Sequence, residues 1–245
     1  MESEGESLMK MLEAIYQPEH EYVTVDENDF KHLDLGFYHK VTAGLKDLGF
    51  TYLSDEEDIT LRNADKGPAL FHPIMIRALV SEDTTIMAGL YHPKMKWWVS
   101  ALSLVMRQHP GKIVDFETEL SNGMFITTTN AKIIEVLNQS ERIISQCCAK
   151  RTSYQELLDV HQDRLTRYLL ENSNVVPLKI ENREEMVASQ NRLQAIKSLY
   201  RGALGVVTKE ELHALSNGNA AAVNALWKEI ERYSKAKNET FEEVS

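Results

Sequence analysis

The sequence lacks the features of a secreted or membrane-spanning protein. Its only two cysteines, Cys147 and Cys148, are adjacent, and a disulfide between neighbours is strained. The first residues, MESEGESLMK, contain no basic segment followed by an apolar one, so no secretory signal is predicted. The longest strongly apolar run, 97–106, is about half as long as a spanning helix. These absences predict a soluble chain in the reducing cytoplasm.

The chain also has fewer basic residues than acidic ones. The chain has 27 Lys and Arg against 37 Asp and Glu, a net charge of −10. Residues 1–34 account for −8 of this charge, because they hold ten acidic and two basic residues. Binding to nucleic acid requires clustered Lys and Arg that displace counterions from phosphates. No basic stripe of that kind is present, so we expect no nucleic-acid partner.

The short motifs of nucleotide and metal-hydrolase chemistry are missing. There is no G-x-G-x-x-G, no G-x-x-x-x-G-K-[ST], no G-x-S-x-G and no H-E-x-x-H. An EF-hand loop and a C-x-x-C pair are absent as well. The sequence therefore names no cofactor, and it favours functions that do not depend on these motifs.

What is present predicts an α+β fold in one continuous unit, 1–245. The 43% content of hydrophobic residues is enough for a sizeable core. We expect an antiparallel sheet at roughly residues 71–148, flanked by an N-terminal helix and a mainly helical C-terminal half. The expected parts are an acidic arm (1–25), a helix with the sheet (26–150), a helical half (151–236) and a frayed tail (237–245).

Apolar spacings of three and four predict helices over 26–48 and 184–204. Two further helices are predicted by capping boxes, in which a hydroxyl and a glutamate three residues later satisfy each other's backbone N–H groups. These boxes begin at Ser153 and Thr208. The acidic run 54–58 predicts a turn between two short extended pieces.

The clearest hairpin joins 112–120 to 124–129 through Asn122-Gly123. Both of these turn residues accept the positive φ that a type I′ turn demands. This turn would pair Leu120 with Phe125. The alternation of apolar and polar residues predicts an antiparallel sheet with one face in solvent.

An acidic row is predicted on this hairpin. Asp115, Glu117 and Glu119 alternate along one strand, so they project from the same face with Cα atoms about 6.5 to 7 Å apart. Carboxylates at that spacing suit a hard cation or an acid–base pair. If the face is covered, their repulsion raises at least one pKa. The simpler interpretation is a solvated face.

A second candidate site combines cationic and aromatic side chains. This composition suits an anionic ligand, a protein partner or a lipid headgroup boundary. The simpler interpretation is a polar turn leading into a core strand. The candidate residues are Tyr91, His92, Lys94, Lys96, Trp97 and Trp98.

Two histidines, His72 and His92, precede prolines at predicted strand ends and would complete a site if they converged with the acidic row. His161 lies on an apolar helical stripe, which is typical of a core histidine with satisfied hydrogen bonds.

The leading functional hypothesis is a non-enzymatic module that binds a ligand or interacts with an unidentified protein or small molecule. One alternative is a small-molecule or metal-dependent enzyme that uses the acidic row. A second is peripheral membrane association through Lys94–Trp98, although the acidic arm would be repelled by an anionic leaflet. A homo-oligomer is compatible with all three.

Overall fold

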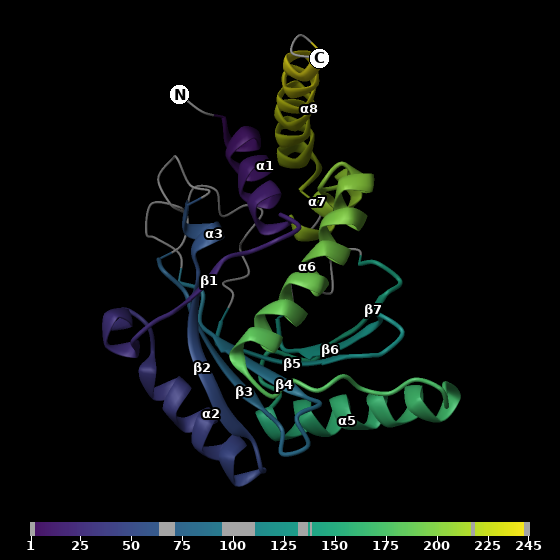
Figure 1. The fold of residues 1–245 in the computed structure, drawn as a ribbon. Coiled ribbons are helices and arrows are strands. Elements are labelled where there is room, and N and C mark those ends of the chain that lie inside the picture. The colour runs from purple at the N-terminus through teal and green to yellow at the C-terminus, as the bar shows by residue number, and fades with distance from the viewer. Residues whose placement is uncertain are drawn as a thin grey trace.

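The fold is α+β, as the sequence predicts (Figure 1). The computed structural model describes residues 3–63, 72–94, 111–131, 137, 139–216 and 219–242, without the side chains of 63 and 238–242. The described residues form a seven-stranded sheet whose spatial order follows the sequence. Neighbouring strands are antiparallel except for the last pair, which is parallel. The strands are β1 (Tyr22–Thr24), β2 (Thr51–Asp58), β3 (Met75–Val80), β4 (Met87–Tyr91), β5 (Ile113–Glu119), β6 (Phe125–Thr129) and β7 (Ile143–Cys147).

Helices lie on both faces of the sheet. In Figure 1, α2 and α5 run along one side, and α6 crosses the other. We call the side beneath α6 the polar face and the side beneath α2 and α5 the apolar face. The helices are α1 (Glu4–Ile15), η1 (Glu27–Phe30), α2 (Leu35–Asp47), α3 (Ile59–Asn63), α5 (Tyr154–Glu171), α6 (Arg183–Leu204), α7 (Lys209–Leu215) and α8 (Ala220–Glu242).

The main hydrophobic core fills the apolar face. Phe116, Leu90 and Tyr38 are completely enclosed there, between the sheet and the helices α2 and α5. His161 of α5 is also fully buried, and its two ring nitrogens lie 3.0 and 3.1 Å from the hydroxyls of Thr118 and Thr128. The prediction of a core histidine with satisfied hydrogen bonds is confirmed.

The prediction of a sheet face in solvent is wrong. Phe125 and Ile143 on the polar face pack against Leu193 and Ile196 of α6. A second apolar contact joins the strands β3 and β4 to Met186 at the other end of the helix. These two contacts hold α6 across the sheet, so the polar alternation of β5 faces a helix instead of bulk water.

The hairpin of β5 and β6 lies where the sequence predicts it, but its register is shifted by one residue. Glu119, not Leu120, pairs with Phe125. The chain turns through a hydrogen bond from the Gly123 N–H to the Leu120 carbonyl, and Gly123 alone takes a positive φ, of 76°. This geometry is that of a type I turn with a glycine bulge, which uses one more residue than a type I′ turn.

Two local predictions near the N-terminal half are also wrong. The segment expected to form one helix over 26–48 is divided into η1 and α2, each capped by an aspartate: Asp26 and Asp34 accept hydrogen bonds from the backbone N–H groups that follow them. The acidic run 54–58, expected to be a turn, belongs to β2.

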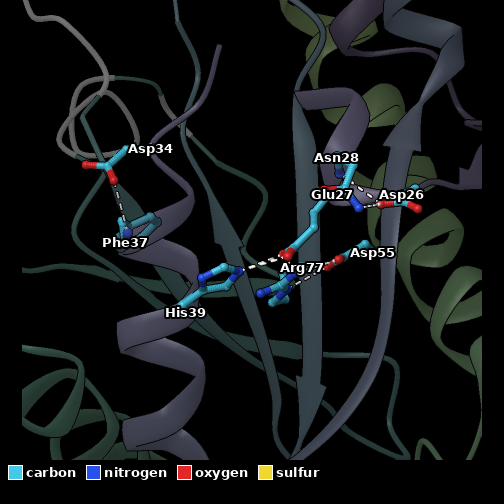
Figure 2. Close-up of polar contacts among 8 residues, drawn as sticks. All are labelled: Asp26, Glu27, Asn28, Asp34, Phe37, His39, Asp55 and Arg77. Atoms are coloured by element: carbon cyan, nitrogen blue, oxygen red, sulfur yellow. Dashed lines mark hydrogen bonds and ion pairs between the residues drawn. The ribbon is translucent and has the colours of Figure 1, made fainter. Parts of the chain in front are cut away.

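The acidic strand β2 is stabilised by an arginine on the neighbouring strand. Arg77 donates from Nε and Nη2 to the Asp55 carboxylate at 2.7 and 2.6 Å, and its Nη2 also reaches Glu27 of η1 at 2.6 Å. His39 of α2 lies 2.9 Å from the same Glu27 (Figure 2). The network therefore ties η1 and α2 to the strands β2 and β3.

Both ends of the described chain meet in a small helical core. Leu8 and Leu12 of α1 pack against Val223 and Ile230 of α8, with Leu212 of α7 between them. The helices α1 and α8 lie side by side in Figure 1. Helix α8 continues to Glu242, into the segment predicted to be a frayed tail. Among the described helices, none has a stretch that is long and apolar enough to pass through a bilayer.

Candidate functional site

The acidic row is enclosed beneath α6, and its three carboxylates have different surroundings. Glu119 is 5% exposed, and its carboxylate accepts hydrogen bonds from Nε and Nη2 of Arg192 at 2.6 and 2.7 Å. This two-point contact matches the planar fork of arginine to a carboxylate. Glu119 therefore has its countercharge, and its evident role is to hold α6 on the sheet.

Glu117 has a neutral partner. Its Oε2 accepts a hydrogen bond from Nε2 of Gln190, one turn before Leu193 on α6, at 2.6 Å. Within the described part of the chain, no ion pair to Glu117 is found. The carboxylate is half-buried, so its negative charge acts on the groups around it with little screening.

Asp115 lies next to Glu117 on the same face of β5. The hydroxyl of Tyr91, on the neighbouring strand, donates a hydrogen bond to its Oδ2. Its Oδ1 is shielded from solvent and has no partner at hydrogen-bond geometry among the described residues. Burial, and then the charge of Glu117, raise the pKa of Asp115 to about 7, against the opposing effect of the Thr129 and Tyr91 hydroxyls. Asp115 is therefore half-ionised near neutral pH.

Two tyrosines lie close to Glu117. Burial raises the pKa of Tyr91, and the charges of Asp115 and Glu117 raise it further. Burial also raises the pKa of Tyr22 in β1, with further contributions from Asp58 and Glu117. Both phenols therefore stay protonated and neutral at physiological pH, and both lie within electrostatic reach of one carboxylate.

A small residue leaves space beside Asp115. Gly89 on β4 lies directly opposite Asp115 on β5, and Ala78 lies opposite Gly89 on β3. A Cβ atom added at Gly89 would meet no heavy atom of the described residues within 4 Å. We call this arrangement the polar site; it comprises Gly89, Tyr91, Asp115, Glu117 and Gln190, together with Tyr22, which lies within electrostatic reach of Glu117.

A histidine–aspartate pair borders the polar site. His20 is 3% exposed, and its Nδ1 lies 2.5 Å from Oδ2 of Asp58 at the end of β2. Its ring stacks on that of Tyr22, with centroids 6.3 Å apart. Two α6 side chains complete the contacts: Asn191 bonds to the backbone of His20, and Nε2 of Gln194 lies 3.4 Å from Nε2 of the ring. His20 is thus held in one orientation by groups from three elements.

The structure separates the residues of the second predicted site. Tyr91 belongs to the polar site, whereas the N–H of His92 donates to the hydroxyl of Tyr38 on the apolar face. Nζ of Lys94 donates to the carbonyl of His32 at 3.0 Å. The other three predicted residues, Lys96, Trp97 and Trp98, and the rest of the apolar run to Met106, lie outside the described residues.

The histidines do not join the acidic row. The rings of His32 and His72 lie 5.2 Å apart, and His32 acts electrostatically on His92 together with Lys112 and Asp34. Among the described side chains, no group of three or more His, Cys, Asp or Glu is arranged to hold a metal ion. Metal binding by the acidic row stays a prediction.

Sequence reasoning missed Tyr22, Gln190 and the pair of His20 with Asp58. One signal for the helix side was available: Gln190, Gln194 and Lys197 are spaced by four and three along the predicted helix 184–204, next to its apolar stripe. A polar row at that spacing faces one direction, and here it faces the acidic strand. Comparisons of this chain with family models, with curated proteins and with solved structures find no match.

Proposed function

We propose that this chain is a ligand-binding module whose polar site, between the sheet and α6, holds a small polar molecule above Gly89. The observation that carries the proposal is the Oδ1 of Asp115, which is shielded from solvent and has no partner at hydrogen-bond geometry among the described residues. Asp115 lies directly opposite Gly89, where an added Cβ would meet open space. A buried acceptor without a donor costs about 1–3 kcal/mol. A ligand that donates to Oδ1 would recover this cost.

The surroundings of the polar site suit binding. Tyr22, Tyr91, Asp115, Glu117 and Gln190 are all half-buried, so they are neither sealed in a core nor free in solvent. The apolar contacts of α6 on both sides fix the helix over the sheet. A few polar groups that converge on a preformed scaffold are typical of small-molecule binding sites.

The test is a ligand-observed NMR screen of a fragment library that contains cationic, neutral and anionic members. Wild type is compared with Gly89→Val, which fills the space, and with Gly202→Val. Gly202 lies on α6 and also has open space around an added Cβ, so it is a matched control. We expect fragments that bind wild type and the control and are lost in Gly89→Val. Fragments that bind all three proteins equally would contradict the proposal.

A second candidate function is proton-transfer catalysis at the same place. It is favoured by the pKa of Asp115 near 7, the value at which a carboxyl group serves as acid or base at neutral pH. In this version a bound fragment would be converted, and its NMR spectrum would change with time in the presence of wild type but not of Asp115→Asn. Unchanged spectra over days would argue against an enzyme.

Membrane association through Lys94–Trp98 is the remaining proposal from the sequence. Lys94 is exposed and bonded to the backbone of His32. Co-sedimentation with anionic vesicles, lost on Trp97→Ala with Trp98→Ala, would support it, and an absence of co-sedimentation would dispose of it.

A further inference from the structure

We infer that the ligand of the polar site is a small organic cation, whose ammonium group binds between the carboxylates of Asp115 and Glu117 and beside the ring of Tyr91. This inference rests on the proposed function and names the chemical class of its ligand.

The charge balance of the polar face favours a cation. The other carboxylates there have a partner that is cationic or can become so: Glu56 pairs with Arg183 at 2.7 Å, Glu119 with Arg192 at 2.6 Å and Asp58 with His20 at 2.5 Å. The two carboxylates of the polar site instead accept hydrogen bonds from a phenol and an amide. Among the described side chains, Lys197 of α6 acts on Asp115 through its charge, which is the smallest of the effects on the pKa of that carboxyl group.

The spacing of the two carboxylates also fits an ammonium group. Asp115 and Glu117 project from the same face of β5, and their Cα atoms lie about 6.5 to 7 Å apart by the rise of a strand. An ammonium group has three donors and no acceptor, so it can donate to both carboxylates, including the Oδ1 of Asp115 that has no partner at hydrogen-bond geometry among the described residues. An anion would meet two negative groups at close range, which the same geometry disfavours.

The tyrosines of the polar site favour a cation as well. Both tyrosines of the polar site are neutral, since burial and nearby negative charge raise the pKa of each phenol. Neutral phenol rings attract a cation through the negative faces of their π-systems. This attraction does not require the phenol to be ionised. A carboxylate pair with two neutral rings is therefore suited to an alkylammonium ion with a short apolar tail.

Cation binding would also be coupled to the ionisation of Asp115. A positive charge favours the ionised carboxyl group, so the ligand binds best above the pKa of Asp115 and releases a proton when it binds below that pKa. The affinity should therefore increase as pH rises from 6 to 8. This pH dependence is a readout that non-specific hydrophobic binding of the tail would not show.

The experiment compares three probes of equal length: n-butylammonium, n-butanol and n-butyrate. Binding is measured by chemical-shift titration of wild type, Glu117→Gln and Asp163→Asn at pH 6 and pH 8. Asp163 belongs to an exposed ion pair on α5 and serves as the control. We expect n-butylammonium alone to bind, at least about 10-fold more weakly to Glu117→Gln, as expected for the loss of one charged hydrogen bond, and more tightly at pH 8 in wild type.

The outcomes separate this inference from the proposed function. Binding of n-butanol or n-butyrate that is lost in Gly89→Val would support the proposed ligand site and contradict the inference that its ligand is a cation. Equal binding of n-butylammonium to wild type and Glu117→Gln would also overturn the cation inference. If none of the three probes binds, the inference fails, and the fragment screen still decides whether the polar site binds another class of molecule.

Discussion

The hydroxyl of Tyr91 donates a hydrogen bond to Oδ2 of Asp115 diagonally across two neighbouring strands. The diagonal arises because Tyr91 is opposite Ile113, while Asp115 is opposite Gly89. Glycine at that position lets the phenol reach the carboxyl group without a side chain between them. The same absence of a side chain leaves the space in which we place the ligand.

Asp115→Asn should make the free energy of unfolding less sensitive to a rise in pH from 5 to 8. The pKa of Asp115 is raised from 3.8 to about 7, so between these values the folded state holds a proton that the unfolded state releases. The free energy of unfolding of wild type therefore falls as pH rises through this range. Between pH 5 and pH 8 this one group accounts for about 3 kcal/mol, at about 1.4 kcal/mol per pKa unit. Urea unfolding at both pH values should show the smaller loss of stability in the asparagine variant. Equal losses of stability in the two proteins would contradict the raised pKa of Asp115.

His161→Gln should have the opposite effect, on the acid side. Burial lowers the pKa of His161 to about 3, so on acidification the unfolded state binds a proton that the folded state does not bind. Wild type therefore loses stability as pH falls from about 6.5 toward 3. Between pH 7 and pH 4 this contribution is about 3 kcal/mol.

The glutamine variant should be less stable than wild type at pH 7, because the hydroxyls of Thr118 and Thr128 lose matched partners. It should nevertheless lose less stability on acidification. Thermal unfolding at pH 7 and pH 4 measures both effects. An acid sensitivity equal to that of wild type would show that His161 is not the responsible group.

Glu211→Gln should strongly destabilise the joint between α6 and α7. Arg201 and Glu211 form an ion pair 2.7 Å apart, with side chains only 3% and 2% exposed. Removing the negative charge of Glu211 breaks this buried ion pair, and breaking such a pair costs on the order of 3–5 kcal/mol. Asp163→Asn, which removes the exposed ion pair with Arg167, should cost less than about 1 kcal/mol. Urea unfolding of the two variants makes the comparison, and similar losses would contradict the buried position of Arg201.

Glu27→Gln should loosen η1 in a pH-dependent way. Hydrogen bonds from Arg77 and then His39 lower the pKa of Glu27, so its contribution to stability is present above the ordinary pKa of a glutamate and is lost as pH falls through the lowered value. We expect a cost of about 0.5–1 kcal/mol at pH 7, typical of a partly exposed ion pair, and a smaller cost at pH 2. Hydrogen exchange of the η1 amides measures the local effect; a cost that is the same at both pH values would contradict it.

Local patterns predicted much of the fold. The capping boxes at Ser153 and Thr208 begin α5 and α7 as expected, with both reciprocal hydrogen bonds present. These features depend on residues within one turn of each other, which the sequence displays directly. Local patterns also predicted the strand of the acidic row, the hairpin around Gly123 and the strand β7.

The predictions that failed depended on distant contacts. The run 54–58 resembles a turn by composition, and it is a strand because Arg77 and Arg183 neutralise Asp55 and Glu56 from elsewhere in the chain. The acidic row resembles a solvated face, and it is covered because Leu193 and Ile196 find apolar partners on β6 and β7.

The polar site itself combines residues of β1, β4, β5 and α6. Asp115, Glu117 and Tyr91 were candidates in two separate predicted sites, and nothing local joined them. Tyr22 carries no sequence signal that links it to β5, and the polar row that contains Gln190 does not say which strand it faces. Only the strand register and the crossing of α6 bring these side chains together.

The most direct test of the ligand site is a titration of isotope-labelled wild type with n-butylammonium at pH 8, followed by backbone amide chemical shifts. The structure predicts saturable shifts centred on Gly89, Asp115 and Glu117, and on Gln190 across from them on α6. Saturable shifts centred elsewhere, or none at all up to high millimolar concentration, would contradict a cation site on the polar face.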